Sequence, residues 1–245
     1  GIETYGEDPY LTSVMGVNVV KGLQCTDANQ KYDKIHACAK HFAVHSGPEW
    51  NRHEFNAENI KPRDLHETYL VPFEALVKEG KVKEVMCAYN RLEGDPCCGS
   101  DRLLMQILRQ EWGYEGIVLS DCGAIDDFYR EKGHKTHPDA ESASAAAVLS
   151  GTDLECGSSY KALVESAKKG LISEKDIDVS VKRLLKARFE LGEMDDPSKV
   201  EWTKIPYSVV CSAEHDSLSL DIARKSMTLL LNKNNILPLK RGGQT

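Results

Sequence analysis

Residues 116–124 read Gly116-Ile-Val-Leu-Ser-Asp-Cys-Gly-Ala124, an apolar run of strand length that ends in a carboxylate. Because glycines bound this run on both sides, it predicts a buried strand that is apolar on both faces, as in a parallel sheet. Asp121 then stands at the C-terminal end of that strand. In sheets of alternating strands and helices, ligands and catalytic groups gather at that end. The alternative is that Asp121 merely caps the following segment.

Three further apolar segments end in polar residues. They are predicted strands at 35–44, 85–90 and 152–156, with polar ends Lys40-His41, Tyr89-Asn90 and Asp153-Glu155. Predicted helices lie at 62–79, 101–112, 139–150, 160–169 and 175–191. A further helix begins at Pro9 and has apolar residues at helical spacing, namely Leu11, Val14, Met15, Val19 and Leu23. Strand and helix alternate as in an α/β protein, and the polar strand ends are typical of the active-site rim of a (β/α) barrel.

A closed barrel needs eight strands, whereas only four are recognised here. We therefore expect residues 1–192 to form the C-terminal half of a (β/α)8 TIM-type barrel, with an open sheet as the alternative. Residues 193–212 lack periodicity and predict a linker. A helix from 213 to 225 and an apolar strand at 227–231 predict that 213–245 begins an α/β domain that the chain does not finish. An internal first residue, Gly1, and the absence of a leader pattern indicate a partial chain.

Composition narrows the function classes. With 245 residues, 41% of them hydrophobic and 28% charged, the chain is an ordinary globular protein. Its apolar stretches are far shorter than the roughly 20 residues that cross a bilayer, so no membrane span is expected. The net charge of −7 provides no electrostatic footprint for nucleic acid or an anionic membrane. A neutral or weakly charged small molecule is the expected ligand.

The cysteines give no metal signature. None of the eight lies in a paired Cys-x-x-Cys spacing, so neither a structural zinc site nor another metal or cofactor is expected. Most are expected to be small core residues. Cys122 and Cys156 are predicted to form a disulfide, because both lie near the rim ends of strands adjacent in sequence.

The polar loop after the strand at 35–44 holds further candidate residues. It carries more functional groups than a simple connection needs, namely Glu49, Trp50, Asn51, Arg52 and His53. Taken singly, each residue has an alternative role: Lys40 could form a Schiff base, His41 could be a core histidine, and Arg52 could form a surface ion pair. Their expected convergence with Asp121 at one rim favours a shared site.

Taken together, these motifs resemble glycoside hydrolase family 3, the exo-acting retaining β-glycosidases with a (β/α) barrel followed by an α/β sandwich. The matching segments span nearly the whole chain: Glu3-Thr4-Tyr5-Gly6-Glu7-Asp8-Pro9-Tyr10-Leu11, Lys40-His41-Phe42, Met86-Cys87-Ala88-Tyr89-Asn90, Val118-Leu119-Ser120-Asp121, Leu229-Leu230-Leu231-Asn232 and Leu237-Pro238-Leu239. The resemblance implies that Asp121 is the nucleophile. It also implies a set of residues that bind the sugar in the −1 subsite: Lys40, His41, Arg52, Tyr89, Met86 and Glu3.

The residue types suit this chemistry. A retaining glycosidase needs an ionised carboxylate on one face of the anomeric carbon and a protonated acid on the other, about 5 to 5.5 Å apart. Lys40 or Arg52 nearby would favour the ionised, nucleophilic form of Asp121. The resemblance implies that the acid/base glutamate lies in the second domain beyond Thr245, so we expect no useful activity from this chain alone. One branch of the family uses an Asp-x-His dyad instead; here Asn51-Arg52-His53 stands at that place, which favours a structural or subsite role for His53.

Within the family, the cysteine after Asp121 and the loop sequence around Arg52 are most similar to the β-xylosidase branch. The expected reaction is the release of a terminal β-linked xylose from oligosaccharides through a covalent glycosyl-aspartate, in a secreted or periplasmic enzyme. A β-glucosidase of the same family and a catalytically incomplete carbohydrate-binding remnant are the alternatives. A barrel lyase or aldolase using Lys40 is a rival from another class.

Overall fold

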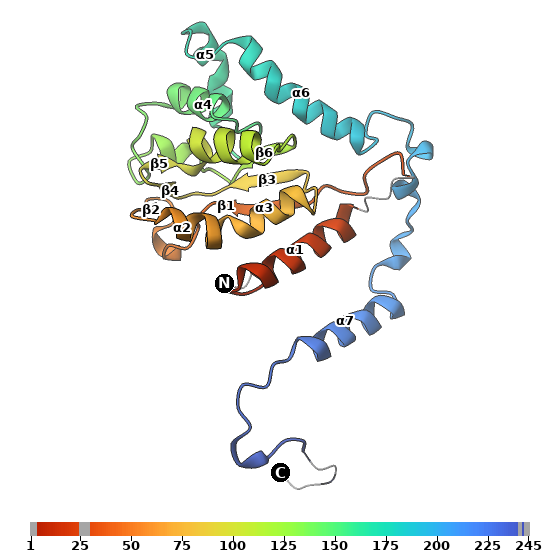
Figure 1. The fold of residues 1–245 in the computed structure, drawn as a ribbon. Coiled ribbons are helices and arrows are strands. Elements are labelled where there is room, and N and C mark those ends of the chain that lie inside the picture. Colours follow the sequence, from red (N-terminus) through yellow and green to blue (C-terminus); the bar gives the residue numbers. More distant parts are fainter. Residues whose placement is uncertain (1–3, 25–29, 240–241, 243–245) are drawn as a thin grey trace. The chain divides into compact units, whose positions relative to one another are not determined.

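The computed structural model describes residues 4–24, 30–239 and 242 (Figure 1). The chain divides by its contacts into two compact units, Gly1–Val200 and Glu201–Thr245. This division falls inside the segment 193–212. Among the described residues, no helix combines the length and hydrophobicity needed to cross a membrane.

A parallel sheet forms the centre of the first unit. Its strands are β1 (Cys38–Phe42), β3 (Glu84–Cys87) and β6 (Ile117–Ser120), and they pair in the order β1-β3-β6. Neighbours in the sheet therefore follow one another along the chain, with helices between them, which confirms the predicted α/β class. The predicted strand at 152–156 is reduced to a single parallel bridge between Leu119 and Leu154.

Helices alternate with these strands, and Figure 1 shows α1 and α3 on one side of the sheet and α4 and α5 on the other. The helices of the first unit are α1 (Pro9–Gln24), α2 (Pro62–Asp64), π-helix η2 (Leu65–Tyr69), α3 (Val71–Lys78), π-helix η4 (Arg102–Glu111), α4 (Ala140–Leu149), α5 (Leu163–Lys168) and α6 (Glu174–Glu190). Short 3-10 turns are η1 (Glu49–Asn51), η3 (Cys97–Gly99), η5 (Asp126–Phe128), η6 (Ser159–Ala162) and η7 (Pro197–Lys199). A small second sheet contains β2 (Asn56–Ala57), β4 (Arg91–Leu92) and β5 (Asp95–Pro96).

The hydrophobic core lies between the sheet and the helices that follow its strands. Val85 and Val118 are fully buried with the leucines of η4. Phe42, at the end of β1, packs edge-on against Phe73 of α3 and against Trp112, with ring centroids 5.1 and 5.8 Å apart. This packing holds the end of β1 in place, and with it the polar residues beside Phe42.

The helix at Pro9 is confirmed, but its buried face differs from the apolar stripe that the sequence suggested. The five stripe residues are all at least 40% exposed: Leu11, Val14, Met15, Val19 and Leu23. The buried side instead holds Val17 and Val20 together with Gly16 and Gln24, and a Cβ at Gly16 would lie only 3.0 Å from Leu76 of α3. The side chain of Gln24 replaces apolar packing with hydrogen bonds to the backbone of residues 37, 81 and 83.

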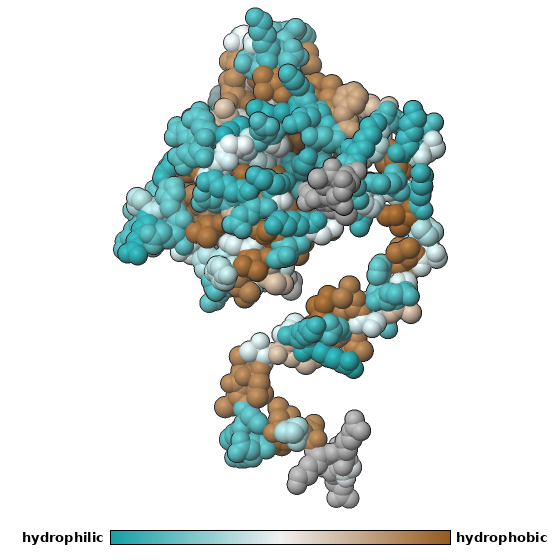
Figure 2. Space-filling view, turned by 45° about the vertical axis from the view of Figure 1, so that its right-hand side comes forward, coloured by the Kyte–Doolittle hydropathy of each residue, from teal (hydrophilic) through white to brown (hydrophobic). Residues whose placement is uncertain are grey.

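In the second unit, α7 (Ala213–Ser226) confirms the predicted helix, whereas residues 227–231 do not form the predicted strand. The other segments of 201–245 that the structure describes offer no strand to pair with, and a strand without a partner leaves its backbone groups unsatisfied. These apolar residues are exposed, with Leu230 at 92%, and the segment after α7 is largely brown in Figure 2.

Within the described ranges, two disulfides link loops to strand ends. The Cys122–Cys156 bond, with an S–S distance of 2.06 Å, confirms the predicted pair. A second bond, Cys87–Cys98, joins two buried cysteines, a pair that the sequence analysis did not predict. Of the other cysteines that the structure describes, Cys97 is buried and Cys38 and Cys211 are exposed.

Candidate functional site

Asp121 lies directly after β6, and its carboxylate is held in a defined orientation. Oδ1 accepts a hydrogen bond of 2.8 Å from the backbone N–H of Cys122. Oδ2 lies 3.3 Å from Nε2 of His41, which lies on β1, on the far side of β3 in the sheet. The side chain is 13% exposed. The carboxylate is therefore anchored on one side and still reachable by a ligand.

Tyr89 contacts the backbone beside this carboxylate. Its hydroxyl donates a hydrogen bond of 2.7 Å to the carbonyl of Cys122, which follows Asp121 in the chain. Burial, reinforced by the negative charge of Asp121, raises the pKa of Tyr89 to about 12. Tyr89 therefore stays protonated, and its hydroxyl remains a donor across the ordinary pH range.

The turn after Asp121 is tied to the next βα connection. Besides the Cys122–Cys156 disulfide, the N–H of Gly123 donates to the carbonyl of Cys156 at 2.7 Å, and the N–H of Cys156 donates to Oγ of Ser120 at 3.0 Å. These cross-links restrict how far the backbone around Asp121 can move.

Lys40 and Met86 share the sheet face that points away from the hydrophobic core. On β1 the exposed Lys40 alternates with buried Ala39, and on β3 the half-buried Met86 alternates with buried Val85 and Cys87. Met86 is also in register with Leu119 on β6. The structure thus places both residues on strands of the sheet whose third strand, β6, ends at Asp121. Glu3, the remaining predicted contact, lies outside the described residues.

Asn90 fixes the ends of two rim strands, a role that the sequence motif did not reveal. Its amide nitrogen donates to the carbonyl of Ala43 at 3.3 Å, and its amide oxygen lies 3.2 Å from Nδ1 of His45. The ring of His45 lies 4.9 Å from that of His41. Asn90 is fully buried, so it connects the segments after β1 and β3 from beneath the rim.

Arg52 joins the site from the loop after β1. Its guanidinium lies over the ring of Tyr89, with Cζ 5.0 Å from the ring centroid. Its Nε donates to Nε2 of His53 at 3.2 Å, and Nδ1 of His53 lies 2.8 Å from Oδ2 of Asp127. Asp127 was not among the predicted site residues. Contacts thus join His41, Arg52 and Tyr89 to Asp121 and its turn.

His134 supports Tyr89 from beneath. Its Nε2 is 2.7 Å from the carbonyl of Tyr89 and must carry the proton, because a carbonyl can only accept a hydrogen bond. Burial lowers the pKa of His134 to about 4, so the ring stays neutral. Nδ1 is buried without a hydrogen-bond partner among the described residues.

The polar end Asp153-Glu155 does not join this rim. The side chain of Asp153 is fully buried in ion pairs with Arg109 and Arg183, both at 2.7 Å. Glu155 accepts hydrogen bonds from the backbone N–H groups of Ser159 and Tyr160. Asp153 therefore neutralises two arginines, and Glu155 holds the backbone of the following turn. The sequence analysis expected polar residues at the ends of four strands to line one rim, and this expectation is wrong for Asp153-Glu155.

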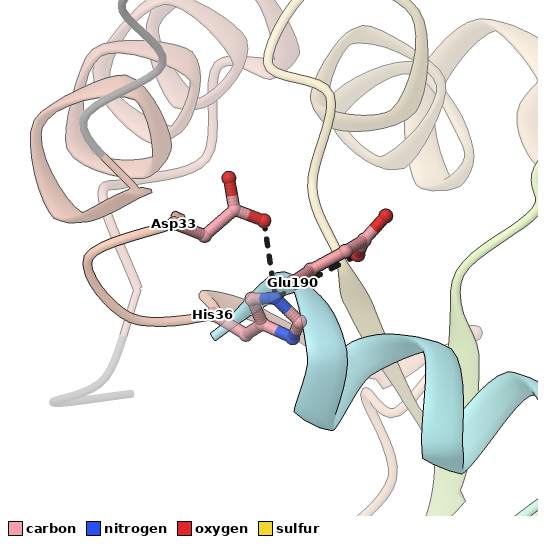
Figure 3. Close-up of side chains that lie close together, drawn as sticks. All are labelled: Asp33, His36 and Glu190. Atoms are coloured by element: carbon pink, nitrogen blue, oxygen red, sulfur yellow. Dashed lines mark hydrogen bonds and ion pairs between the residues drawn. The ribbon is translucent and has the colours of Figure 1, made fainter. Parts of the chain in front are cut away.

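One cluster in the described residues has metal-ligand character. Single ligand atoms of Asp33, His36 and Glu190 lie within 4.8 Å of one another (Figure 3). The Nζ of Lys83 lies 2.8 Å from Oδ2 of Asp33 and 3.1 Å from Oε2 of Glu190. Burial lowers the pKa of Lys83, but hydrogen bonds to Asp33 and Glu190 raise it more, so the ammonium stays charged. A metal would have to displace this cation, and we assign none.

Lys83→Met is expected to lower the free energy of unfolding by about 1–3 kcal/mol, between the values typical of exposed and of buried ion pairs. The physical reason is that Asp33 and Glu190, with side chains 21% and 31% exposed, would lose their shared counter-ion. Urea unfolding measures the effect. Lys78→Met is the matched control, because Lys78 forms an exposed pair with Glu74 and should change stability by less than about 0.5 kcal/mol. Equal effects of the two substitutions would contradict the expectation.

The chain is similar in sequence to known glycoside hydrolases. The family model described as the glycosyl hydrolase family 3 N-terminal domain matches residues 1–187. A xylan 1,4-β-xylosidase from Xylanibacter ruminicola is 59% identical over 246 residues, which cover 100% of this chain and 28% of that protein. β-D-Xylosidase 1 from Arabidopsis thaliana is 37% identical over 243 residues, which cover 98% of this chain and 31% of that protein. The chain thus spans less than a third of the length of these curated relatives.

Solved structures show the same fold. An exo-β-xylosidase of glycoside hydrolase family 3, in complex with a xylobiose aziridine activity-based probe, matches with a TM-score of 0.90 and 32% identity, covering 98% of this chain and 31% of that chain. A β-glucosidase from Listeria innocua in complex with isofagomine matches with a TM-score of 0.86 and 30% identity, covering 98% of this chain and 33% of that chain.

Proposed function

This chain belongs to glycoside hydrolase family 3, and we propose that it supplies the nucleophile and part of the sugar-binding site of an exo-acting retaining β-glycosidase that releases a terminal β-linked xylose from oligosaccharides. The position of Asp121 supports this most directly. Its anchored, reachable carboxylate lies at the end of a parallel strand, beside His41 and Tyr89. The relatives named as β-xylosidases support xylose as the sugar.

In the proposed reaction, the carboxylate of Asp121 attacks the anomeric carbon, and the bond from this carbon to the leaving oxygen breaks. The leaving oxygen takes a proton from a general acid, and water then cleaves the glycosyl-aspartate ester. Lys40, His41 and Arg52 are proposed to donate hydrogen bonds to sugar hydroxyls, while Tyr89 and Met86 line the subsite. Such hydrogen bonds accelerate the reaction where they strengthen in the transition state.

We assign the general acid to a glutamate of the family's second domain, on the resemblance alone. His53 is the alternative within the described residues, but its Nε2 already accepts a hydrogen bond from Arg52 and its Nδ1 faces Asp127. With both ring nitrogens engaged, His53 is poorly arranged to protonate a leaving group. We therefore do not assign proton transfer to it.

Residues 1–192 are proposed to be part of a (β/α)8 barrel, 193–212 a linker and 213–245 the beginning of an α/β sandwich domain. The chain-order pairing β1-β3-β6 supports the first assignment, because consecutive strands are neighbours in such barrels. The two disulfides support a secreted or periplasmic location, since disulfides persist in oxidising compartments.

The test of the substrate is kcat/KM of the complete gene product for 4-nitrophenyl β-xyloside and β-glucoside. We expect the xyloside to be preferred by about tenfold or more, because a pocket fitted to a pentose must accommodate an extra hydroxymethyl group in the glucoside. A preference for the glucoside would favour a β-glucosidase, as in the similar Listeria innocua structure. Xylose binding in calorimetry without turnover would favour a non-catalytic remnant, and borohydride trapping of substrate on Lys40 would favour a lyase or aldolase.

A further inference from the structure

Arg52 is held by a chain of contacts from His53 and Asp127, two residues to which the proposed reaction gives no role in bond making or proton transfer. His53 stands between Arg52 and Asp127: its Nε2 is 3.2 Å from Nε of Arg52, and its Nδ1 is 2.8 Å from Oδ2 of Asp127. The His53 ring also meets the ring of Tyr89 edge-on, with centroids 4.5 Å apart. Arg52 and His53 thus use the same aromatic ring as a support.

The partners determine which nitrogen of His53 carries the proton. An arginine Nε–H can only donate, so Nε2 of His53 must be the unprotonated acceptor. Nδ1 then carries the hydrogen and donates it to the carboxylate of Asp127. Asp127 therefore selects the one neutral form of His53 that can accept from Arg52.

Asp127 is itself fixed in place. Its side chain is only 5% exposed, and burial raises the pKa of Asp127 against the opposing effect of the His53 hydrogen bond. The backbone carbonyl of Asp127 accepts from the N–H of His134, and a Cβ at Gly133 would lie 2.3 Å from that carbonyl oxygen. Only glycine allows this close approach of the two chain segments. His134 in turn holds the backbone of Tyr89.

The remaining donors of Arg52 are available to a ligand. Nε donates to His53 and Nη1 donates to Glu49. In the described part of the chain, these contacts leave Nη2 to donate elsewhere. The Arg52 side chain is 40% exposed and its guanidinium lies over Tyr89, whose hydroxyl donates to the carbonyl of Cys122, the residue after Asp121.

We propose that His53 and Asp127 are positioning residues, which hold the guanidinium of Arg52 over Tyr89 so that Nη2 donates to a hydroxyl of the sugar bound beside Asp121. This inference rests on the proposed glycosidase function. It assigns the Asp127–His53 pair to substrate binding through Arg52 and not to proton transfer.

A double-mutant cycle in the complete gene product tests the proposal. Arg52→Ala, His53→Ala and Asp127→Ala are each expected to lower kcat/KM for 4-nitrophenyl β-xyloside about 10- to 100-fold, the effect of losing a hydrogen bond to a charged group. In the Arg52→Ala background, His53→Ala or Asp127→Ala should cost less than about threefold more, because their effect passes through Arg52. Asp127→Asn keeps an oxygen that accepts from Nδ1 and should stay within about fivefold of the wild type.

A second substrate separates positioning from proton transfer. Nitrophenolate leaves with little acid assistance, whereas the sugar leaving group of xylobiose needs it. A positioning role predicts equal fold losses on both substrates for His53→Ala, because the sugar beside Asp121 is the same. A much larger loss on xylobiose would make His53 the acid/base and overturn the proposal.

Glu131→Gln is the matched control, because Glu131 is an exposed carboxylate on the same loop and should leave kcat/KM unchanged. Additive losses in the double variants would overturn the inference while leaving the proposed function intact. A wild-type protein that cleaves neither xyloside nor glucoside would instead refute the function. If Asp127→Ala fails to fold, the results for His53→Ala and Asp127→Asn still test whether the two residues act through Arg52.

Discussion

Asp121→Asn is expected to lower kcat for 4-nitrophenyl β-xyloside by about 10⁴-fold or more in the complete gene product, because an amide oxygen cannot form the covalent glycosyl intermediate. The substitution should leave the fold intact. Asparagine retains an oxygen that accepts the Cys122 N–H now bound to Oδ1, and the side chain is partly exposed. The free energy of unfolding should therefore change by less than about 1 kcal/mol.

Covalent labelling gives an independent measurement of the same prediction. A 2-fluoro-xyloside with a good leaving group should trap the intermediate on the peptide from Gly116 to Tyr129, and mass spectrometry identifies it. Asp95→Asn is the control, because Asp95 is an exposed carboxylate on β5 and should retain wild-type activity. Label on another peptide, or activity of Asp121→Asn above about a tenth of the wild type, would show that another residue is the nucleophile.

The sequence was most informative where one segment of chain contains the whole signal. The run at 116–124 joins an apolar strand to a carboxylate, so both the buried β6 and the place of Asp121 at its end could be predicted. The Cys122–Cys156 bond could be predicted because the regular geometry of neighbouring βα units brings those positions together.

Contacts between irregular segments could not be predicted. His53 and Asp127 are 74 residues apart, on two loops whose paths depend on η1 and η5. The Cys87–Cys98 bond depends on a 3-10 turn that brings the two Cα atoms within 5.1 Å. Neither arrangement leaves a periodic pattern in the sequence, because each requires the fold to be complete first.

The sequence did not show which side chains are buried where the buried surface contains small or polar residues. Helical spacing showed that residues 9–24 form a helix, but the side that faces α3 is the one where Gly16 lies against Leu76, and the polar Gln24 is buried on that helix as well. Asp153 shows the same limit: a carboxylate at the end of an apolar segment can line a rim or neutralise buried arginines, and the sequence pattern is identical in both cases.

Asp153→Ala is accordingly expected to cost about 3–5 kcal/mol of unfolding free energy, the penalty for leaving a buried charge unpaired. Oδ2 of Asp153 accepts from Arg109 at 2.7 Å and from the N–H of Val118 at 2.9 Å, while Oδ1 accepts from Arg183 at 2.7 Å. Burial lowers the pKa of Arg109 and the charge of Asp153 opposes that effect. Without Asp153, the Arg109 side chain, 7% exposed, would keep its charge with no counter-ion.

Guanidinium unfolding of the complete gene product measures this cost, and amide hydrogen exchange at Val118 reports it locally, because that N–H loses its acceptor. Asp178→Ala is the matched control, since Asp178 is exposed on α6 and should change stability by less than about 0.5 kcal/mol. Adding Arg109→Met to Asp153→Ala should recover part of the loss, because it removes one of the two arginines left without a counter-ion. Two outcomes would contradict this expectation: a double variant no more stable than Asp153→Ala, or an Asp153→Ala variant as stable as the control. Either would show that the ion pairs of Asp153 do not hold β6 to η4 and α6.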